Sequence, residues 1–478
     1  MFRRRTLLGK KGDKPEYLTF TATSSGTFKF TKAGLSYSTN GNTWTALAAN
    51  TSTPTIAAGS KIYFKGTMTP VSNSGIGTFS STGKFTASGT PMSLLFGDSF
   101  EGQTSLSGKG YAFYRLFSNC TELTSIDGLL LPATTLASNC YNWMFMDCIG
   151  LTSIPSTLLP ATTLANECYR QMFRGCRGLT SIPSTLLPAR TLASSCYSYM
   201  FQGCTRLTSI PSTPLRATTL ADYCYQYMFS GCTGLTSIPT GLLPATTLAN
   251  GCYYNMFSGC TGLTSIPSTL LPATTLAERC YYYMFYGCTR LTNVPNLPAT
   301  TLARYCYAYM FQGCTGLTSI PTGLLPATTL ANQCYFDMFT DCTSLTNVPN
   351  LPATTLAIQC YYSMFQSCTG LTSIPSNLLP ATTLADNCYY FMFWGCTNIT
   401  VAPDLPATTL VYCCYYDMFY HCSKLNSIRM LATDISATNC LRGWVYDVAS
   451  SGTFYKKSGV TIPSGDSGIP SGWTVVNE

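Results

Sequence analysis

The chain has 478 residues, of which 46% are hydrophobic, only 10% are charged and 25 are cysteines. No run approaches the roughly 18 consecutive apolar residues that a membrane-spanning helix needs, so the composition does not indicate a membrane span. A single histidine excludes a repeated histidine-based catalytic or metal site.

The first 14 residues form a basic arm that carries six of the Lys and Arg residues and one Asp, and so most of the formal net charge of +8. The apolar core and cleavage site of a signal peptide do not follow these basic residues. Two interpretations stay open: a disordered tail, or an arm that docks on an acidic partner surface. No companion motif indicates specific nucleic-acid binding. The candidate anchoring residues are Arg3, Arg4, Arg5, Lys10 and Lys11.

Residues 15–106 alternate apolar and polar side chains with the period of half-buried strands. Asn40-Gly41 predicts a hairpin, because both residues tolerate positive φ. We therefore expect a small antiparallel β-sandwich that serves as a mounting domain. The expected strands lie around 18–20, 28–30, 35–37, 61–65 and 78–86.

Residues 107–448 consist of one repeated unit. Each unit reads Cys-Tyr-x-x-Met-Phe-x-x-Cys, then Thr-x-Leu-Thr-Ser-Ile-Pro, then Leu-Leu-Pro-Ala-Thr-Thr-Leu-Ala. Eleven full units run from Cys140 to Cys422, and a degenerate unit lies at each end, at 112–120 and 440–448. The step is 28 residues and falls to 26 three times, by loss of two residues between the prolines. Such a period predicts a solenoid with capping end repeats.

Within a unit, the apolar residues recur at helical spacing after Thr162 or Thr163, which would cap a helix. The β-prone run 179–182 then ends at Pro183. We therefore expect an α/β solenoid with one strand and one short helix per repeat, and a C-terminal cap at 449–478. The helical stripe comprises Leu164, Ala165, Cys168, Tyr169, Met172, Phe173 and Cys176.

The cysteines recur in pairs eight residues apart. On one helix this spacing separates them by about 12 Å, too far for a disulfide. Ala112 and Val448 replace one cysteine of the pair in the end units, so the position accepts a small buried apolar side chain. We expect stacked free thiols, with disulfides between neighbouring repeats as the alternative. The spacing fits no zinc site, and we expect no metal or cofactor.

Near-identical repeats differ most between Tyr and Met, where 12 of 22 residues are aromatic and nine are tyrosines. Drift on an exposed helix would favour Lys, Glu, Gln and Ala, whereas Tyr with Ser, Asn and Asp is typical of binding surfaces. Three interpretations stay open: an aromatic binding face, packing between helices, and neutral drift. The candidate ligand-binding residues, with three that follow the Phe, are Trp143, Tyr199, Tyr227, Tyr254, Tyr282, Tyr283, Tyr286, Tyr309, Phe336, Tyr362, Tyr390, Phe391, Trp394, Tyr416 and Tyr420.

The motif Phe-x-x-Cys-x-x-Leu-Thr-Ser-Ile resembles the BspA-like leucine-rich repeats of bacterial surface proteins. The extra Leu-Pro-Ala-Thr-Thr-Leu-Ala-x-x-Cys-Tyr segment departs from the commoner form of that repeat. The C-terminal residues, with Trp444 and 468–473, resemble the tails of repeat proteins of gut anaerobes and their bacteriophages. The resemblance implies a leucine-rich-repeat array that serves adhesion and binding.

The sequence shows no catalytic constellation, and we predict a protein without enzymatic activity. His421 stands where most units have Gly, and we expect an exposed side chain there. The predicted function is a bacteriophage virion fibre or spike, assembled in the host cytoplasm and anchored to virion structural proteins through the arm. The solenoid would bind a host-surface protein or glycan, as a monomer or a homo-oligomer. The alternative is a bacterial cell-surface or secreted BspA-like adhesin.

Overall fold

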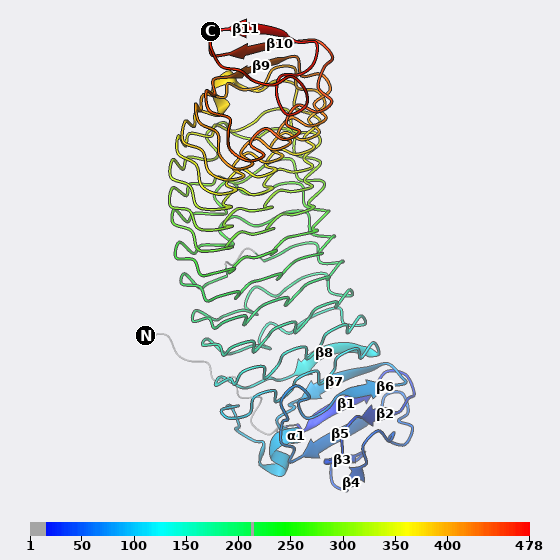
Figure 1. Cartoon of the computed structure of the whole chain (residues 1–478). Helices are drawn as coiled ribbons and strands as arrows, with labels where there is room; N and C mark the ends of the chain where they lie inside the picture. Colours follow the sequence, from blue (N-terminus) through cyan, green and yellow to red (C-terminus); the bar gives the residue numbers. More distant parts are fainter. Residues whose placement is uncertain (1–15, 212–214) are drawn as a thin grey trace.

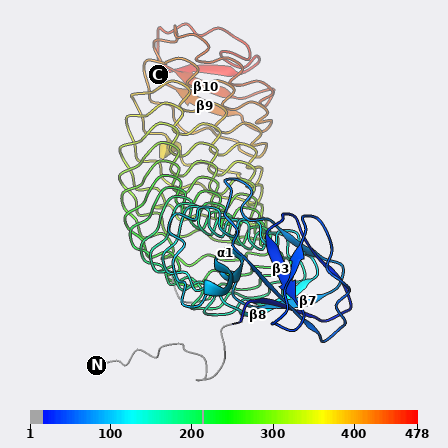
Figure 2. The same cartoon turned by 90° about the horizontal axis from the view of Figure 1, so that it is seen from below.

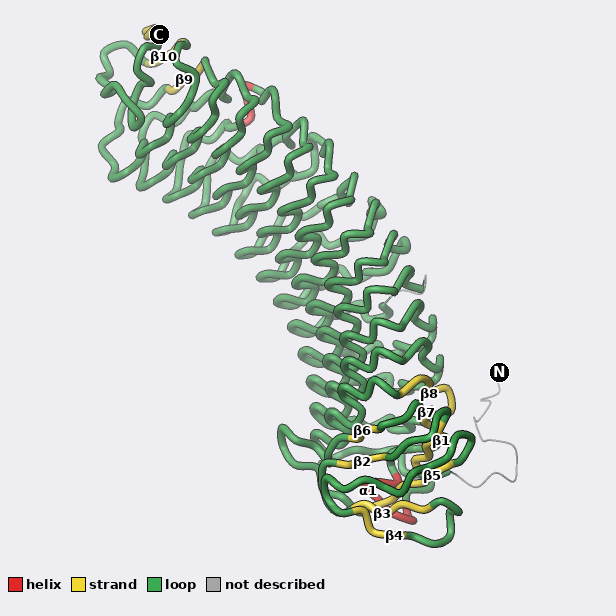
Figure 3. The backbone as a smooth tube through the Cα atoms, turned by 90° about the vertical axis from the view of Figure 1, so that its right-hand side faces the viewer, coloured by secondary structure: helices red, strands yellow, loops and turns green. Residues whose placement is uncertain are grey.

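The computed structural model describes residues 16–211 and 215–478. A β-rich region lies at one end of a long, curved column in which the repeats are stacked as successive coils (Figure 1; Figure 3). The candidate anchoring residues of the arm, Arg3, Arg4, Arg5, Lys10 and Lys11, lie outside the described residues. No helix in the described part of the chain is long and apolar enough to cross a membrane.

The strands of the β-rich region are β1 (Leu18–Ala22), β2 (Phe28–Phe30), β3 (Leu35–Ser38), β4 (Thr45–Leu47), β5 (Lys61–Gly66), β6 (Phe79–Ser81), β7 (Phe85–Gly89) and, in the first repeat, β8 (Leu123–Leu129). Strands lie at every predicted place, but the single strand predicted at 78–86 is divided into β6 and β7, and β4 and β8 were not predicted. The main sheet has the order β4-β3-β5-β1-β7-β8, and β2 pairs with β6. The predicted hairpin at Asn40-Gly41 is confirmed, because it joins the antiparallel strands β3 and β4.

Phenylalanines join these two sheets to each other and to the repeats. The Phe20 ring on β1 lies 5.2 Å from Phe28 on β2 and 4.9 Å from Phe79 on β6, between ring centroids. It also lies 5.8 Å from Phe117 in the first repeat. Because β7 and β8 pair in parallel, that repeat extends the main sheet. The β-rich region and the repeats therefore share one hydrophobic core, and Figure 2 shows β7, β8 and α1 (Ser93–Phe96) together at this end of the column.

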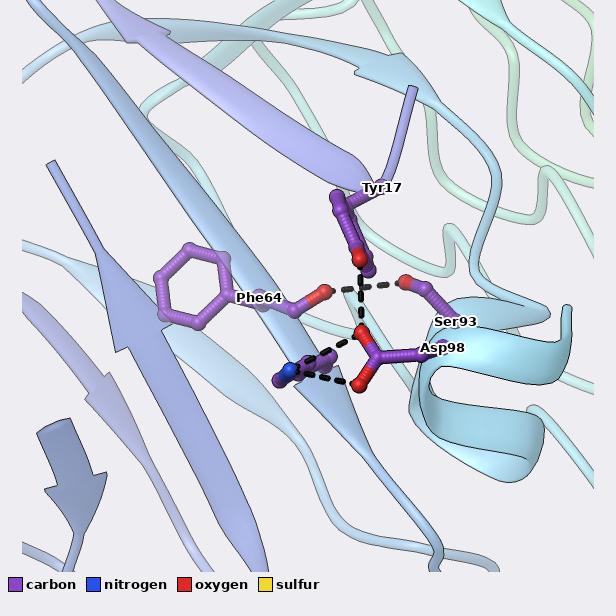
Figure 4. Close-up of polar contacts among 5 residues, drawn as sticks. Tyr17, Phe64, Ser93 and Asp98 are labelled. Atoms are coloured by element: carbon purple, nitrogen blue, oxygen red, sulfur yellow. Dashed lines mark hydrogen bonds and ion pairs between the residues drawn. The ribbon is translucent and has the colours of Figure 1, made fainter. Parts of the chain in front are cut away.

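Polar contacts hold α1 and the following 3-10 helix η1 (Gly97–Ser99) against the sheet (Figure 4). The Ser93 hydroxyl donates to the Phe64 carbonyl at 2.9 Å, and the Tyr17 hydroxyl donates to Asp98 at 2.6 Å. Lys65 Nζ lies 2.8 Å from the same carboxylate. The bonds from Lys65 and Tyr17 lower the pKa of Asp98, whereas burial and Asp98 raise the pKa of Tyr17 to about 12.

The segment Cys-Tyr-x-x-Met-Phe-x-x-Cys is not the predicted helix. It forms a chain of overlapping four-residue turns, which we call the turn ribbon (139–148 in the first full unit). In the ribbon, each even-numbered residue donates its N–H to the carbonyl of the residue three places earlier in the chain, as Asn142 does to Asn139 at 3.2 Å. Each odd-numbered residue donates its N–H to a carbonyl of the next repeat, as Tyr141 does to Cys168 at 3.0 Å. The ribbon thus divides its bonds between its own turns and its neighbour.

Every second turn has its third residue in the left-handed region. In the first full unit these residues are Asn139, Trp143 and Asp147, with φ of 59°, 60° and 56°. The four-residue spacing recurs in every unit, with Gly often in the last of the three positions. A left-handed residue at every fourth position is incompatible with an α-helix, which explains why the helix prediction is wrong.

The predicted strand of each repeat is also wrong for most units. The runs between 151 and 403 show isolated parallel bridges, such as Ser237 with Ser265, but no regular strand. These runs all end in Ile-Pro or a related pair, and proline has no N–H to donate to a ladder. Regular strands appear where the proline is missing, at Asp127 in β8 and Arg429 in β9 (Ser427–Met430). Figure 3 shows the strands confined to the two ends of the column.

The interior of the column is made of ring ladders. The phenylalanine of each unit stacks on that of the next, from Phe117 to Phe419, with centroids 5.4 Å apart at the first step. The tyrosine that follows the first cysteine forms a second ladder, with steps such as 5.9 Å between Tyr169 and Tyr197. Trp444 ends this second ladder at 6.2 Å from Tyr415. All of these rings are buried, so they form the core.

All 25 cysteines are buried with free thiols. In each full unit the second cysteine donates its S–H to the phenylalanine carbonyl of the preceding unit, for example from Cys176 to Phe145 at 3.1 Å. Burial raises the pKa of these thiols, to about 12 for Cys232 and well above its ordinary value for Cys176. The thiols therefore act as small apolar groups that also satisfy a carbonyl.

Residues 449–478, expected to cap the array, add two further parallel strands, β10 (Thr453–Lys456) and β11 (Thr474–Asn477), to β9. The indole of Trp444 is buried below them and donates from Nε1 to the Gly468 carbonyl at 2.8 Å. The remaining element is the 3-10 helix η2 (Ser376–Leu378).

The Tyr197 hydroxyl is buried and has no hydrogen-bond partner among the described residues. We predict that Tyr197→Phe keeps the ring stack, removes this unpaired group and raises the free energy of unfolding by about 1 kcal/mol. Tyr197→Ala should instead lower it by about 3–5 kcal/mol, because it leaves a cavity between two rings. Urea unfolding of both variants measures these changes. A lower free energy of unfolding for Tyr197→Phe than for the wild type would show that the hydroxyl makes a stabilising hydrogen bond.

Candidate functional site

Most variable residues of the turn ribbons are partly exposed, whereas some small ones, such as Ser198, Ala308 and Ser363, are buried. In Cys-Tyr-x-x-Met-Phe-x-x-Cys we number the four variable positions from first to fourth. The second and fourth have positive φ in every unit. Because each coil is bonded in register to the next, side chains at the same variable position lie beside each other in successive repeats.

Eleven of the fifteen candidate residues form one continuous set of ring contacts, which we call the aromatic ladder. Typical stacked steps are 4.5 Å between the centroids of Tyr199 and Tyr227 and 4.3 Å between Tyr283 and Tyr309. In some repeats the ladder ring stands at the second variable position and in others at the first. Where it passes from one to the other, the two rings meet edge-on or tilted, as Tyr227 and Tyr254 do at 5.6 Å between centroids. Its members are Tyr199, Tyr227, Tyr254, Tyr282, Tyr283, Tyr309, Phe336, Tyr362, Tyr390, Phe391 and Tyr416.

The other four candidates lie at the sides and ends of this ladder. Tyr286 is the most exposed, at 42%, and meets Tyr283 edge-on at 5.2 Å. Trp394 and Tyr420 stack on each other at 6.2 Å, at the third variable position. Trp143 lies apart near the first repeats, where the Arg115 guanidinium lies 3.8 Å from the centroid of one of its rings.

The ladder rings pack against each other and also remain partly exposed to solvent. Every member is partly buried, because its faces are covered by the rings above and below. For example, this burial raises the pKa of the Tyr362 hydroxyl to about 12, where Asp337 adds to the effect, and it raises the pKa values of Tyr227 and Tyr309 further. These three hydroxyls are therefore neutral donors at physiological pH. Ring edges and hydroxyls are the parts left for a ligand.

Asp337 is an acidic residue embedded in this face. It occupies the second variable position with φ of 52° and is 9% exposed. Thr340 donates its hydroxyl to Asp337 Oδ1 at 2.8 Å. Burial raises the pKa of Asp337 to about 7, against the opposing effect of that hydrogen bond. The carboxyl therefore keeps its proton to a higher pH than an exposed Asp does.

Sequence reasoning missed several residues that share this surface. Tyr305, directly before a first cysteine, meets Tyr282 edge-on at 5.8 Å and has the Arg304 guanidinium 4.9 Å from its ring. His421 is not a simple exposed histidine, because its Nδ1 lies 2.7 Å from Asp447 Oδ2 and its ring meets Tyr420. The variability of these positions between repeats was the available signal. Among residues 16–211 and 215–478, no group of His, Cys, Asp and Glu could hold a metal ion.

Stacked coils with buried leucines at a fixed period define a leucine-rich-repeat protein. The chain belongs to the BspA-type leucine-rich-repeat family. The family model, a BspA-type leucine-rich repeat region of six copies, matches at 113–228, 144–266, 194–338, 253–372 and 332–440, about two thirds of the chain. No curated protein matches the chain.

One solved structure with some similarity is the crystal structure of a TLR13–ssRNA13 complex, at 15% identity and a TM-score of 0.26. The match covers 73% of this chain and 50% of that one, so the chain spans about half the length of that relative. A likeness of this size carries no argument about function.

The buried carboxyl of Asp337 predicts a pH-dependent stability. Its pKa is raised on folding from 3.8 to about 7, so the folded state binds the proton more tightly than the unfolded state. Stability should therefore fall as pH rises between these two values, by about 1.4 kcal/mol per pH unit at most, and level off above them. Asp337→Asn should remove this fall, so that the variant melts above the wild type at pH 8.

Calorimetry at pH 5, 6, 7 and 8 measures the difference, with Asp386→Asn, an exposed carboxyl, as the control. Parallel melting profiles of the wild type and Asp337→Asn would contradict the raised pKa.

Proposed function

We propose that this chain is a non-enzymatic adhesion protein that binds a surface partner through the aromatic ladder. The observation that carries the proposal is the ladder itself, an unbroken row of partly buried rings from Tyr199 to Tyr416 on the outer side of the turn ribbon. Tyrosine supplies large contact area and a polar hydroxyl at low cost in side-chain entropy, which suits a binding surface.

The backbone conformation supports a functional reading of these rings. Tyr199, Tyr283 and Phe391 have φ of 59°, 55° and 57°, a region that costs a bulky residue about 1–2 kcal/mol. Asn255 and Gly443 occupy the same variable position, so residues better suited to that conformation fit there. Stability alone would favour Gly or Asn at every unit. Large rings at strained positions are therefore kept for what they contact outside the fold.

The membership of the BspA-type family supports adhesion in general terms. The aromatic ladder would serve adhesion in the same way on either of two surfaces, a bacteriophage particle or a bacterial cell. In the first, the protein is a bacteriophage fibre held on the particle by the basic arm; in the second, it is a bacterial surface adhesin.

The ladder is tested by replacing four of its rings with serine, at Tyr282, Tyr283, Tyr390 and Phe391. Serine already occupies both positions in other repeats, at Ser198 and Ser363, so the variant should fold. We expect at least a tenfold loss of adhesion to host-derived cells or mucus, measured by surface binding of labelled protein. The variant should remain folded but unfold at a lower temperature than the wild type, because each lost ring contact contributes about 0.5–1.5 kcal/mol.

The matched control replaces exposed residues on another side of the coil, Ser265, Thr292 and Thr372, with alanine. Unchanged adhesion in the serine variant together with a folded array would contradict the proposal, and the rings would then serve packing alone.

The setting is tested by mass spectrometry of purified phage particles and of washed cell envelopes. If the protein is a fibre, its peptides, including those of the arm, are enriched in the particle fraction. Deletion of residues 1–14 should then prevent incorporation into particles. Peptides confined to the envelope fraction would contradict the fibre setting and favour the adhesin.

A further inference from the structure

An open hollow lies at the C-terminal end of the aromatic ladder. It has a volume of about 410 Å³ and is lined by Gln366, Phe391, Trp394, Asp417, Tyr420 and His421. These residues come from three successive repeats, and Phe391 is also a member of the ladder. The volume lies within the range of about 300–1,000 Å³ that is usual for small-molecule sites.

The Trp394 ring has one stacked face and one face without a ring against it. Its described ring contacts are with Tyr420 at 6.2 Å and His421 at 5.9 Å, both in the following repeat. The preceding repeat has Gln366 at the same variable position. Because side chains at the same variable position lie beside each other, the Gln366 amide lies on the side of the indole away from Tyr420. The hollow is lined by this amide, which both donates and accepts hydrogen bonds, and by the part of the indole that the amide leaves open.

The remaining lining supplies hydrogen-bonding groups but no Lys or Arg. Asp417 provides carboxylate oxygens, and burial raises its pKa while Arg442 nearby lowers it. Asp447 holds His421 through Nδ1 at 2.7 Å, which leaves Nε2 for a ligand. Tyr446 stacks on Tyr420 at 4.5 Å and fixes that ring from behind. The His421 imidazole and the Tyr420 ring are thus held in place by residues of the following unit.

We propose that this hollow binds a neutral saccharide, as the specificity-determining part of the adhesion face. The C–H bonds on one face of a pyranose ring carry partial positive charge and complement the negative face of the Trp394 indole. The hydroxyls of the sugar pair with Gln366, Asp417 and His421, since each hydroxyl both donates and accepts. The inference rests on the proposed adhesion function and names its ligand class.

Two other ligand classes fit this lining less well. An anionic sugar or phosphate would meet the Asp417 carboxylate without a lining cation. A quaternary ammonium needs Trp, Tyr or Phe faces that converge around it. The planes of Trp394 and Tyr420 are only 13° from parallel, and His421, which lies at 72° to Trp394, is not one of these residue types.

The test uses the full chain and variants that copy residues of other repeats. Trp394→Gln reproduces Gln366, and Asp417→Ser reproduces Ser363, so both should fold. The alanine variant of Ser265, Thr292 and Thr372, which are exposed residues outside the hollow and the ladder, is the control. The probes are an array of neutral hexose and N-acetylhexosamine oligosaccharides, their sialylated counterparts, and titration calorimetry with the best binder.

We expect the wild type and the alanine control to bind neutral oligosaccharides equally, and Trp394→Gln and Asp417→Ser to bind at least tenfold more weakly. Periodate treatment of the target surface, which destroys vicinal diols, should abolish adhesion, whereas protease treatment should not. Comparing purified mucin with bacterial envelope polysaccharide then identifies the source of the sugar.

Absence of glycan binding, a preference for sialylated glycans, or full binding by Trp394→Gln would overturn the inference. If adhesion still depends on the four ladder rings in that case, the saccharide assignment fails and the adhesion proposal stands. If adhesion is also independent of those rings, both fail.

Discussion

The fold depends on how the main-chain N–H groups of the turn ribbon divide their hydrogen bonds between their own coil and the next coil. In the turn ribbon, every second N–H closes a turn of its own coil and the others reach the next coil, so each amide is satisfied without helix or regular strand. The left-handed residue at every fourth position makes this alternation possible, because it reverses the chain after each pair of turns. The register between repeats is thereby imposed by the backbone, before any side chain is considered.

In-register stacking makes every column of side chains a ladder. The Phe and Tyr columns fill the interior with ring contacts, and the cysteine column supplies thiols that pair with carbonyls of the preceding unit. The same constraint acts on the outside. An aromatic residue at one variable position in two successive repeats must lie against its counterpart, as Tyr362 and Tyr390 do at 4.7 Å. The aromatic ladder is therefore a direct consequence of the repeat register and of which variable positions carry rings.

The repeat period, the apolar positions and the aromatic variable positions could all be predicted from the sequence, because each can be found by aligning the repeated units with one another. The local conformation could not. Cys168, Met172 and Cys176 recur every four residues, and a 3.6-residue helix would rotate this column by about 40° at each step. That mismatch, and the proline that ends each β-prone run, were the signals against helix and strand. Gln366, Asp417 and His421 were missed because the hollow joins different variable positions from three repeats, which no single unit displays.

The fold separates what must stay constant from what can vary. Residues that face the interior are nearly identical from unit to unit, since each must fit the same ladder. The four variable positions touch mainly their own counterparts, and they accept Gly, Asn, Asp, Gln, Tyr, Phe and Trp without altering the coil. A change of ligand thus requires only substitutions along the ribbon, at a modest cost in backbone strain. Because that strain falls on the second and fourth variable positions and not on the buried Phe, Tyr and Cys columns, a new binding surface can be built on the array without disturbing the stacking that supports it.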